Sequence, residues 1–323
     1  MSAYRVLVVS NVDAPYVRDD CAILGALGPV EFLRYRGRRD LGRLAIASLR
    51  SDIIVSWFAI GYATTAVLLG RVLRTPTVVI AAGWDVMALP ELNYGALLSK
   101  GRARKTRYAL EKASVVLAVS ASTQEAAQKL VSREILVVPN AVDTNFLRPA
   151  DLERHNQVIT VAGVDNEVRY RVKGIDILVR VAERMQNVRF VLVGRNSPEW
   201  DERLRALAPP NLEIMGFVDR NRIRELYQES RVCFQPSAQE SFCVSLVEAM
   251  ACGCVPVASD RGALPEIVGK AGYVAPYGDV SASAGAISQA LADNGQAART
   301  RASSMFALDS RRDVLLSHVR RLL

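Results

Sequence analysis

Residues that commonly bind metal ions or form disulfide frameworks are scarce in this chain. Its 323 residues include two histidines, His155 and His318, and five cysteines. Cys252 and Cys254 lie too close together for the usual zinc-binding pair, and no histidine is near them. The odd number of cysteines argues against a disulfide scaffold. We therefore expect free, buried thiols and no structural metal site.

Long apolar runs and a secretion signal are also missing. The longest apolar run, residues 59–70, contains two threonines and ends at Arg71. It is shorter than the roughly 18 residues that a membrane-spanning helix needs. The first residues lead directly into the strand-like VLVVS without a cleavage pattern. These absences predict a soluble protein of the cytoplasm.

Lysine is rare beside arginine, and the positive charge is unevenly distributed. The formal net charge is +8; residues 1–145 hold 18 Lys and Arg against 12 Asp and Glu, and the remainder holds 23 against 21. The excess is concentrated in RYRGRRDLGR (34–43) and KGRARKTR (100–107). Two interpretations remain open: a solvated arginine-rich surface, or peripheral contact with anionic lipid headgroups or an anionic acceptor. Nucleic acid is not expected, because neither stretch interleaves aromatic residues.

Short apolar runs alternate with helical patterns along the whole chain, which predicts an α/β fold with parallel sheets. The length allows two domains of about 150 residues each. The turn-rich segment 139–149 predicts a linker between them. We place the domains at residues 1–145 and 146–305, with a C-terminal helix over 306–323. Strands are expected at residues 5–10, 30–33, 52–57, 77–80, 115–119, 135–138, 158–161, 189–193, 212–215, 232–235 and 255–258.

The most informative segment is PSAQESFCVSLVEAMACGCVPVASDRGALPE, residues 236–266. It follows the strand-like RVCFQ, and a helix is expected to begin near Val244 or Ser245 and to end at Gly253. Glu240 then precedes the helix, and Glu248 lies in its first turn. The unpaired amides and the positive dipole at a helix N-terminus bind anions. The segment thus predicts a site for a phosphate group flanked by two carboxylates.

This order of residues, with its Glu-x7-Glu motif, resembles the donor-binding motif of retaining glycosyltransferases of family 4. The resemblance is specific over roughly residues 210–270 and implies the GT-B fold, in which two Rossmann-like doubly wound domains face each other across a cleft. It implies transfer of a hexose from a nucleotide diphosphate sugar to a hydroxyl of a glycan, lipid or small molecule. The family uses no Asp-x-Asp metal site, and none occurs here, so no metal or other cofactor is expected.

The resemblance also implies roles for individual residues of the second domain. Glu240 would hold the sugar and Glu248 the ribose, while Lys173 with Arg169 or Arg171 would clamp the diphosphate. These two arginines lie closer to the lysine than is usual in the family, so the choice between them stays open. The family's base-contacting loop falls on Gly216 and Phe217, and its main-chain donors to the phosphates fall on Phe242, Cys243 and Val244. Ser241 and Cys243 stand where the family commonly has glycine.

The first domain departs further from the family. The loops 11–16 and 83–90 follow predicted strands and would form the acceptor side, with Asn11, Asp13, Gly83 and Asp85 as candidates. Where the family usually has His-Gly-x-Asp, this chain has Ala82, Gly83, Trp84 and Asp85. Asp85 is therefore a candidate for binding hydroxyls or for capping a helix. Retaining transfer in this fold needs no protein nucleophile, so the missing histidine does not exclude activity.

Several alternatives remain at this stage. The chain could be a catalytically silent nucleotide-sugar-binding protein, or a sugar-nucleotide epimerase of the same architecture, which would need more acid and base groups around the sugar. The last helix either returns to the first domain, as is common in GT-B enzymes, or lies on a membrane. Work in cell-envelope polysaccharide synthesis at the inner face of the membrane is an expectation from the family and from the basic first domain.

Overall fold

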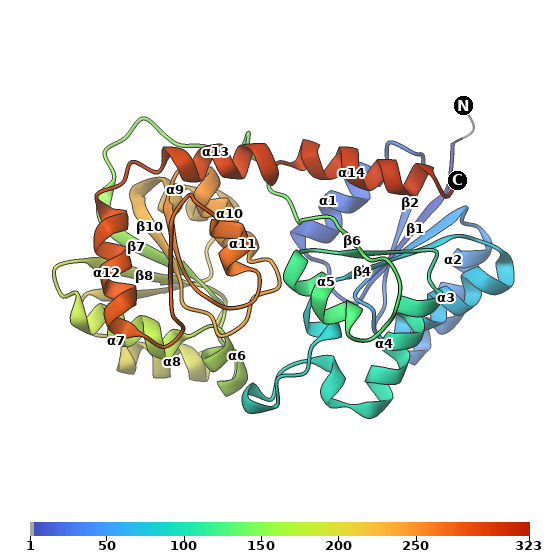
Figure 1. Ribbon diagram of the computed structural model, residues 1–323, viewed down its shortest axis with the longest axis horizontal. Coiled ribbons are helices and arrows are strands. Elements are labelled where there is room, and N and C mark those ends of the chain that lie inside the picture. The colour runs from blue at the N-terminus through green and yellow to red at the C-terminus, as the bar shows by residue number, and fades with distance from the viewer. Residues whose placement is uncertain (1–2) are drawn as a thin grey trace. The chain divides into compact units, whose positions relative to one another are not determined.

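The computed structural model describes residues 3–323, which form two compact units (Figure 1). Unit 1 runs to Asn140 and also includes Leu308–Leu323, whereas unit 2 comprises Ala141–Ala307. The boundaries expected from the sequence lay after residues 145 and 305. Among the described residues, no helix combines the length and the hydropathy that crossing a bilayer requires.

Unit 1 contains a parallel six-stranded sheet in the order β2-β1-β3-β4-β5-β6. Its strands are β1 (Val6–Ser10), β2 (Val30–Arg34), β3 (Ile53–Trp57), β4 (Thr77–Ala81), β5 (Val115–Ala118) and β6 (Leu136–Val137). Its α-helices are α1 (Pro15–Leu24), α2 (Leu41–Leu49), α3 (Gly61–Leu73), α4 (Lys100–Lys112), α5 (Ala121–Gln128) and α14 (Leu308–Arg320).

The helices of unit 1 pack on the sheet through buried aliphatic side chains. Leu44 of α2, Ala66 of α3 and Ala109 of α4 share one core with Leu7 and Ile54 of the strands. Neighbouring helices α2, α3 and α4 contact one another in sequence order, whereas α1 packs against α14. Because parallel crossovers are right-handed, reversing direction after β2 places α1 and α2 on opposite faces of the sheet. The helices α2–α4 therefore form one outer layer.

Unit 2 contains a second parallel six-stranded sheet in the order β12-β11-β10-β7-β8-β9. Its strands are β7 (His155–Val161), β8 (Arg189–Val193), β9 (Leu212–Gly216), β10 (Ser230–Gln235), β11 (Val255–Ser259) and β12 (Tyr273–Ala275). Its helices are α6 (Glu167–Val172), α7 (Ile175–Arg184), α8 (Pro198–Leu207), α9 (Arg220–Glu229), α10 (Val244–Ala251), α11 (Leu264–Val268), α12 (Val280–Leu291) and α13 (Gln296–Met305).

The predicted fold class is confirmed, because both units are doubly wound α/β domains with parallel sheets. All eleven predicted strands are present, with ends that shift by up to three residues. The prediction missed β12, whose three residues at the edge of the second sheet are too few to show a pattern. Glu248 was placed wrongly in the first turn of its helix. Helix α10 begins at Val244, so Val244–Val247 fill that turn and Glu248 follows it.

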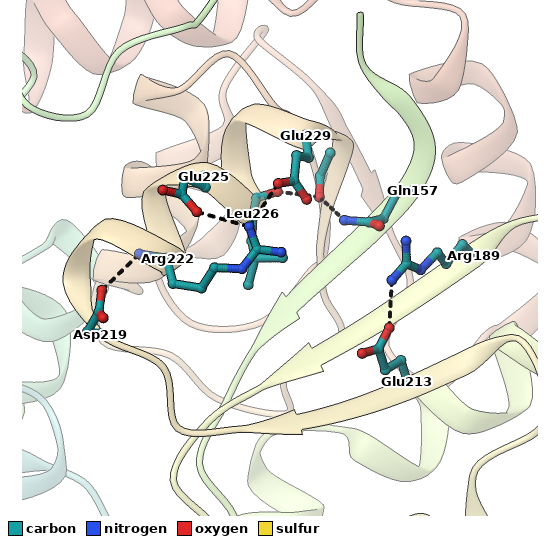
Figure 2. Close-up of polar contacts among 9 residues, drawn as sticks. Gln157, Arg189, Glu213, Asp219, Arg222, Glu225, Leu226 and Glu229 are labelled. Atoms are coloured by element: carbon teal, nitrogen blue, oxygen red, sulfur yellow. Dashed lines mark hydrogen bonds and ion pairs between the residues drawn. The ribbon is translucent and has the colours of Figure 1, made fainter. Parts of the chain in front are cut away.

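Polar contacts secure α9 and the strands beside it (Figure 2). Asp219 caps the helix by accepting the amide of Arg222, and the Arg222 guanidinium contacts both Glu225 and Glu229. Gln157 of β7 donates to the hydroxyl of Ser230 at 2.8 Å. These contacts hold the start of β10, which is the strand that leads to Glu240.

Other polar contacts join strands, and one buried ion pair joins α14 to the rest of unit 1. On the edge of the second sheet, Arg189 and Glu213 pair across β8 and β9 at 2.6 Å. In unit 1, the Arg311 guanidinium contacts both carboxylate oxygens of Asp20 in α1, at 2.6 and 2.8 Å. Both side chains of that pair are almost completely buried. Arg311 also donates to the carbonyls of Val138 and Pro139, which follow β6. A residue of the last helix thus fixes two segments of the first 140 residues.

Candidate functional site

The loop that leads from β10 to α10 brings polar groups to the carboxyl edge of the second sheet. Helix α10 begins at Val244, as predicted, and most of its side chains are buried. Cys243 precedes it with φ 64°, a left-handed conformation that glycine adopts more easily than cysteine. The backbone here therefore adopts a turn that suits glycine, although the residue is a cysteine. The main-chain amides at the start of α10 can still donate hydrogen bonds to an anion.

Lys173 and Glu240 form the central contact of this edge. The Lys173 ammonium lies 2.6 Å from Oε1 of Glu240, with 29% of the lysine side chain and 10% of the glutamate side chain exposed. The corner that carries the lysine is joined to the loop by a bond from the amide of Ala238 to the carbonyl of Val172. A Cβ on Gly174 would lie 2.0 Å from the carbonyl oxygen of Pro236, so only glycine allows this close approach. The local fold thus builds the pair.

Glu240 is oriented by further hydrogen bonds. Its Oε1 also accepts from the Ser237 hydroxyl at 3.1 Å and from the Gln235 amide at 3.4 Å. On the other side of the loop, the Glu240 carbonyl accepts the amide of Ala263, and a Cβ on Gly262 would lie 2.2 Å from that carbonyl oxygen. Both the side chain and the main chain of Glu240 are consequently held in place. This is what a residue that must meet a ligand in one orientation requires.

Glu248 has a different set of neighbours. The Tyr227 hydroxyl of α9 donates to its carboxylate at 3.2 Å. Burial, with the Glu248 charge as a further cause, raises the pKa of Tyr227 well above its ordinary value. The phenol therefore stays protonated and remains a donor. Sequence reasoning missed Tyr227, because its position is typical of the apolar side of an ordinary helix.

The two candidate arginines before Lys173 point to other partners. Arg169 pairs with Asp165 at 3.4 Å, and Arg171 pairs with Glu167 at 3.0 Å. Both arginine side chains are more than half exposed. Of the three predicted cations, Lys173 is the one that forms an ion pair with Glu240 within residues 3–323. The assignment of an arginine to the diphosphate stays a prediction.

The remaining donor-side candidates differ in what they present. Phe242 and Cys243 are buried, and Phe242 packs edge-on against Phe306, so these positions offer main-chain groups only. Gly216 has φ 69° and open space where a side chain would be, while Phe217 is 66% exposed. The guanidinium of Arg195 lies 4.5 Å from the Phe217 ring centre. Arg195 follows β8 and was not predicted.

The far end of α10 is held by two arginines that sequence reasoning also missed. Arg299 of α13 donates to the carbonyl of Ala251 at 2.9 Å and to the carbonyl of Leu147 at 2.8 Å. Arg154 donates to the carbonyls of Cys252 and Gly253. Cations at a helix C-terminus offset its negative dipole end and use its unpaired carbonyls. The C-terminal end of the helix that carries Glu248 is thus fixed by hydrogen bonds from two arginines.

The first-domain candidates lie at the carboxyl edge of the first sheet. Asp85 is fully buried, and its two oxygens accept the amides of Ala59 at 2.6 Å and Ala82 at 3.0 Å. Burial raises the pKa of Asp85 to about 6, against the effect of these backbone amides. In this conformation Asp85 ties two loops together; it neither caps a helix nor faces solvent. Gly83 beside it has φ 109°, which favours glycine.

Asn11 and Asp13 remain at the surface of unit 1. The Asn11 side chain accepts from the Tyr62 hydroxyl at 3.2 Å. Asp13 pairs with Arg18 at 2.6 Å, and hydrogen bonding to that guanidinium lowers the pKa of the carboxyl. Of the four first-domain candidates, these two have side chains accessible to a ligand. No group of His, Cys, Asp and Glu within residues 3–323 has the arrangement of a metal site.

Both halves of the chain match models of known protein families. Residues 4–146 match the model of Glycosyltransferase Family 4, and residues 156–293 match that of Glycosyl transferases group 1. A subunit of the phosphatidylinositol N-acetylglucosaminyltransferase of Arabidopsis thaliana is 32% identical over 143 residues, covering 42% of this chain and 31% of that protein. The chain therefore spans about a third of the length of the first curated relatives it matches.

Solved structures share the fold over almost the entire chain. Sucrose-phosphate synthase from Thermosynechococcus elongatus superposes with a TM-score of 0.78 at 19% identity, covering 99% of each chain. HepE of Anabaena, solved in complex with UDP, also gives a TM-score of 0.78 at 19% identity, covering 98% of this chain and 100% of that one. These similarities identify the fold as GT-B. Both halves of the chain thus match glycosyltransferase models, a family 4 domain followed by a group 1 domain.

Proposed function

We propose that this protein is a retaining glycosyltransferase that moves a hexose from a nucleotide diphosphate sugar to an acceptor hydroxyl without a metal ion. The observation that carries the proposal is the partly exposed Lys173–Glu240 pair, held beside the loop that starts α10. A cation and a fixed carboxylate next to a helix N-terminus offer complementary groups for a phosphate joined to a sugar. Family membership of both domains supports the same conclusion.

The proposed chemistry rests on charge that develops as the sugar leaves. When the bond between the anomeric carbon and the phosphate breaks, negative charge grows on the diphosphate. Lys173 and the amides at the start of α10 would stabilise that charge more strongly in the transition state than in the ground state. The leaving phosphate would accept the acceptor's proton on the same face of the sugar. No protein nucleophile is then needed.

Two carboxylates would orient the donor. Glu240, fixed through its Oε1, would accept hydrogen bonds from sugar hydroxyls. Glu248 would accept those of the ribose, with the Tyr227 phenol holding one of its oxygens. The exposed Phe217 ring under Arg195, beside the open backbone at Gly216, would contact the base. Backbone and ring contacts of this kind are compatible with uracil, guanine or adenine.

The acceptor is proposed as a hydroxyl of a glycan, a lipid or a small molecule. The name of the Arabidopsis relative places its own acceptor among phosphatidylinositol lipids, which makes a lipid-linked acceptor reasonable here. On the acceptor side we propose Asn11, Asp13 and the backbone at Gly83. Asp85 is proposed as the residue that keeps this loop closed, because its carboxylate is occupied. We propose that the protein works in the cytoplasm, on cell-envelope polysaccharide.

Binding measurements with matched variants test the donor site. Calorimetry with UDP, GDP and ADP should show one preferred nucleotide, and Lys173→Ala and Glu248→Ala should each weaken its binding by roughly tenfold or more. Arg180→Ala, an exposed change on the helix that follows Lys173, is the control and should bind normally. Unchanged affinity in both site variants would overturn these assignments.

Activity measurements test the reaction itself. With the matching nucleotide sugar, the protein should transfer or slowly hydrolyse the hexose, keep its activity in a chelator, and give a product with the donor's anomeric configuration by NMR. Glu240→Ala should lower turnover more than nucleotide affinity. Inversion of configuration, or activity lost to chelation, would refute retention or metal independence. Nucleotide binding with neither transfer nor hydrolysis would instead identify a catalytically silent binding protein.

A further inference from the structure

The outer layer formed by α2, α3 and α4 in unit 1 exposes an unusual number of large apolar side chains. Of the twelve large hydrophobic residues exposed within residues 3–323, six lie on this layer or on the 3-10 turn Ala96–Leu98 next to it. They are Leu41, Ile46, Leu49, Leu68, Val72 and Leu98, of which Val72 is 80% exposed and Leu49 66%. Single exposed apolar residues need no explanation, but a group on neighbouring helices does.

These apolar positions recur at helical spacing, so each helix presents them on one side. On α2, Ile46 and Leu49 lie three residues apart, and on α3, Leu68 and Val72 lie four apart. The opposite sides of the same helices carry Leu44 and Ala66 into the core. Because α2, α3 and α4 contact one another in order, their outward sides form one surface. We call it the α2–α4 face.

Cations border the apolar residues on this face. Lys100, Arg102, Arg104, Lys105 and Arg107 of α4 are all at the surface, as are Arg71 and Arg74 at the end of α3. Within residues 3–323, Arg104, Lys105 and Arg107 form no ion pair with a carboxylate. This differs from α8 and α9, where Arg205, Arg222 and their neighbours pair with acids along the helix. Among the described residues, these three cations of α4 thus have no carboxylate partner, and the helix as a whole carries Glu111 as its one acid.

A groove lies among the cations of this face, and its Thr64 is one helical turn before the apolar Leu68 on α3. It has a volume of about 600 Å³ between α3 and α4 and is lined by Thr64 on one side and by residues of α4 on the other, among which Arg104, Lys105 and Arg107 outnumber the single acid, Glu111. The two walls are joined by a bond from the Thr64 hydroxyl to the carbonyl of Lys105 at 2.8 Å. Cationic side chains around a groove of this size suit a phosphate-bearing headgroup, while apolar residues beside it suit the boundary of acyl chains.

We propose that the α2–α4 face docks unit 1 onto the surface of a membrane that contains anionic phospholipid, with a headgroup phosphate in the α3–α4 groove. The occupant follows from charge complementarity combined with apolar exposure. A soluble anion would use the arginines and leave Ile46, Leu49 and Val72 in water, whereas a lipid surface uses both sets. The inference goes beyond the proposed function, and docking requires no glycosyl transfer.

Co-sedimentation with lipid vesicles tests the proposal. The protein should bind vesicles of equal parts phosphatidylcholine and phosphatidylglycerol, bind pure phosphatidylcholine much more weakly, and lose binding as salt rises. Each removed cation near the surface should weaken binding about fivefold, so R104Q combined with R107Q should lose roughly twenty- to thirtyfold. The matched control is R180Q with R184Q, the same change on exposed positions of α7, and it should change binding little.

A second pair of variants separates a membrane from other anionic partners. L49S with V72S removes apolar surface but no charge, and both positions are exposed, so folding should be preserved. This pair should also weaken vesicle binding severalfold. Equal binding to the two vesicle types, or equal losses in the α7 control, would overturn the proposal. If the serine variants bind vesicles as the unaltered protein does, the apolar residues do not contact the membrane, and docking through this face is refuted. Failure of vesicle binding would leave nucleotide binding unaffected and so would not touch the proposed function.

Discussion

The two sheets use an acidic residue at their carboxyl edges in opposite ways. In unit 1, Asp85 is fully buried and both of its oxygens are occupied by backbone amides. In unit 2, Glu240 is also buried, but its partner is the side chain of Lys173, of which 29% is exposed. The first arrangement closes loops, while the second leaves charged groups that a ligand can reach. The side chains proposed to recognise the donor are therefore concentrated in unit 2.

Buried and accessible ion pairs should also differ in what they contribute, and the largest effect is expected at Arg311. Arg311→Ala leaves the carboxylate of Asp20 buried without its partner, and it removes two bonds to carbonyls after β6. We expect the free energy of unfolding in urea to fall by about 3–5 kcal/mol. Arg312→Ala, next in sequence but exposed, should change it by less than about 1 kcal/mol. Equal losses in the two variants would contradict this interpretation.

The burial of Asp85 predicts a specific dependence of stability on pH. Its folded pKa of about 6 exceeds an ordinary value of about 3.9, so between these values the folded chain binds more protons than the unfolded one. This carboxyl therefore lowers stability as pH rises from about 4 to 6, on the order of 3 kcal/mol in all. Asp85→Asn should lack this component. The free energy of unfolding of the unaltered protein minus that of the variant, measured by denaturation at each pH, should decrease across that window. A constant difference would argue that Asp85 titrates normally.

Tyr227 offers a further test of the proposed donor site in unit 2. Tyr227→Phe keeps the buried ring and removes only the hydroxyl that orients Glu248. Loss of one hydrogen bond to a charged group should weaken nucleotide binding by roughly tenfold, while the folded state is retained. Tyr170→Phe, a half-buried tyrosine of α6, serves as the control. If calorimetry gives the same dissociation constant for Tyr227→Phe and the unaltered protein, the phenol has no part in positioning Glu248.

The smallest effect is expected where the units differ in how a helix ends. In unit 2, α10 is followed by Gly253 at φ 86°, whereas in unit 1, α3 ends at Arg74 with φ 59°. A left-handed conformation suits glycine better than arginine, so Arg74→Gly should raise stability by about 0.5–1 kcal/mol. Gly253→Ala should lower it by about 1 kcal/mol or more, since its new Cβ would also approach Arg154. Thermal unfolding of the two variants measures both signs.

The sheets were predictable from sequence because buried parallel strands read as nearly continuous aliphatic runs. VLVVS and IIVSW carry that signal, and the three residues of β12 do not. The start of α10 was also predictable, from the strand before it and the glycine after it. The turn at Cys243 keeps a glycine-like backbone although the motif there has no glycine.

Contacts between distant segments were not predictable, because no local pattern encodes them. The sequence suggested a phosphate role for Lys173 and a sugar role for Glu240, but not that these side chains meet across 67 positions. The burial of Asp85 depends on the amide of Ala59 in another loop. Arg299 donates to carbonyls 48 and 152 positions away. In the sequence it cannot be told from an arginine on the solvated side of a helix. Such residues can be found only once the chain is folded.

The pairing of Asp20 with Arg311 has a consequence for the order of events on the ribosome. The two residues are separated by 291 positions, so the first sheet leaves the exit tunnel long before the guanidinium that neutralises its buried acid exists. Until α14 is synthesised, the nascent first half must keep that carboxylate hydrated. The second half, whose residues are contiguous, can reach its final packing earlier. Translation would therefore complete the later domain before the earlier one.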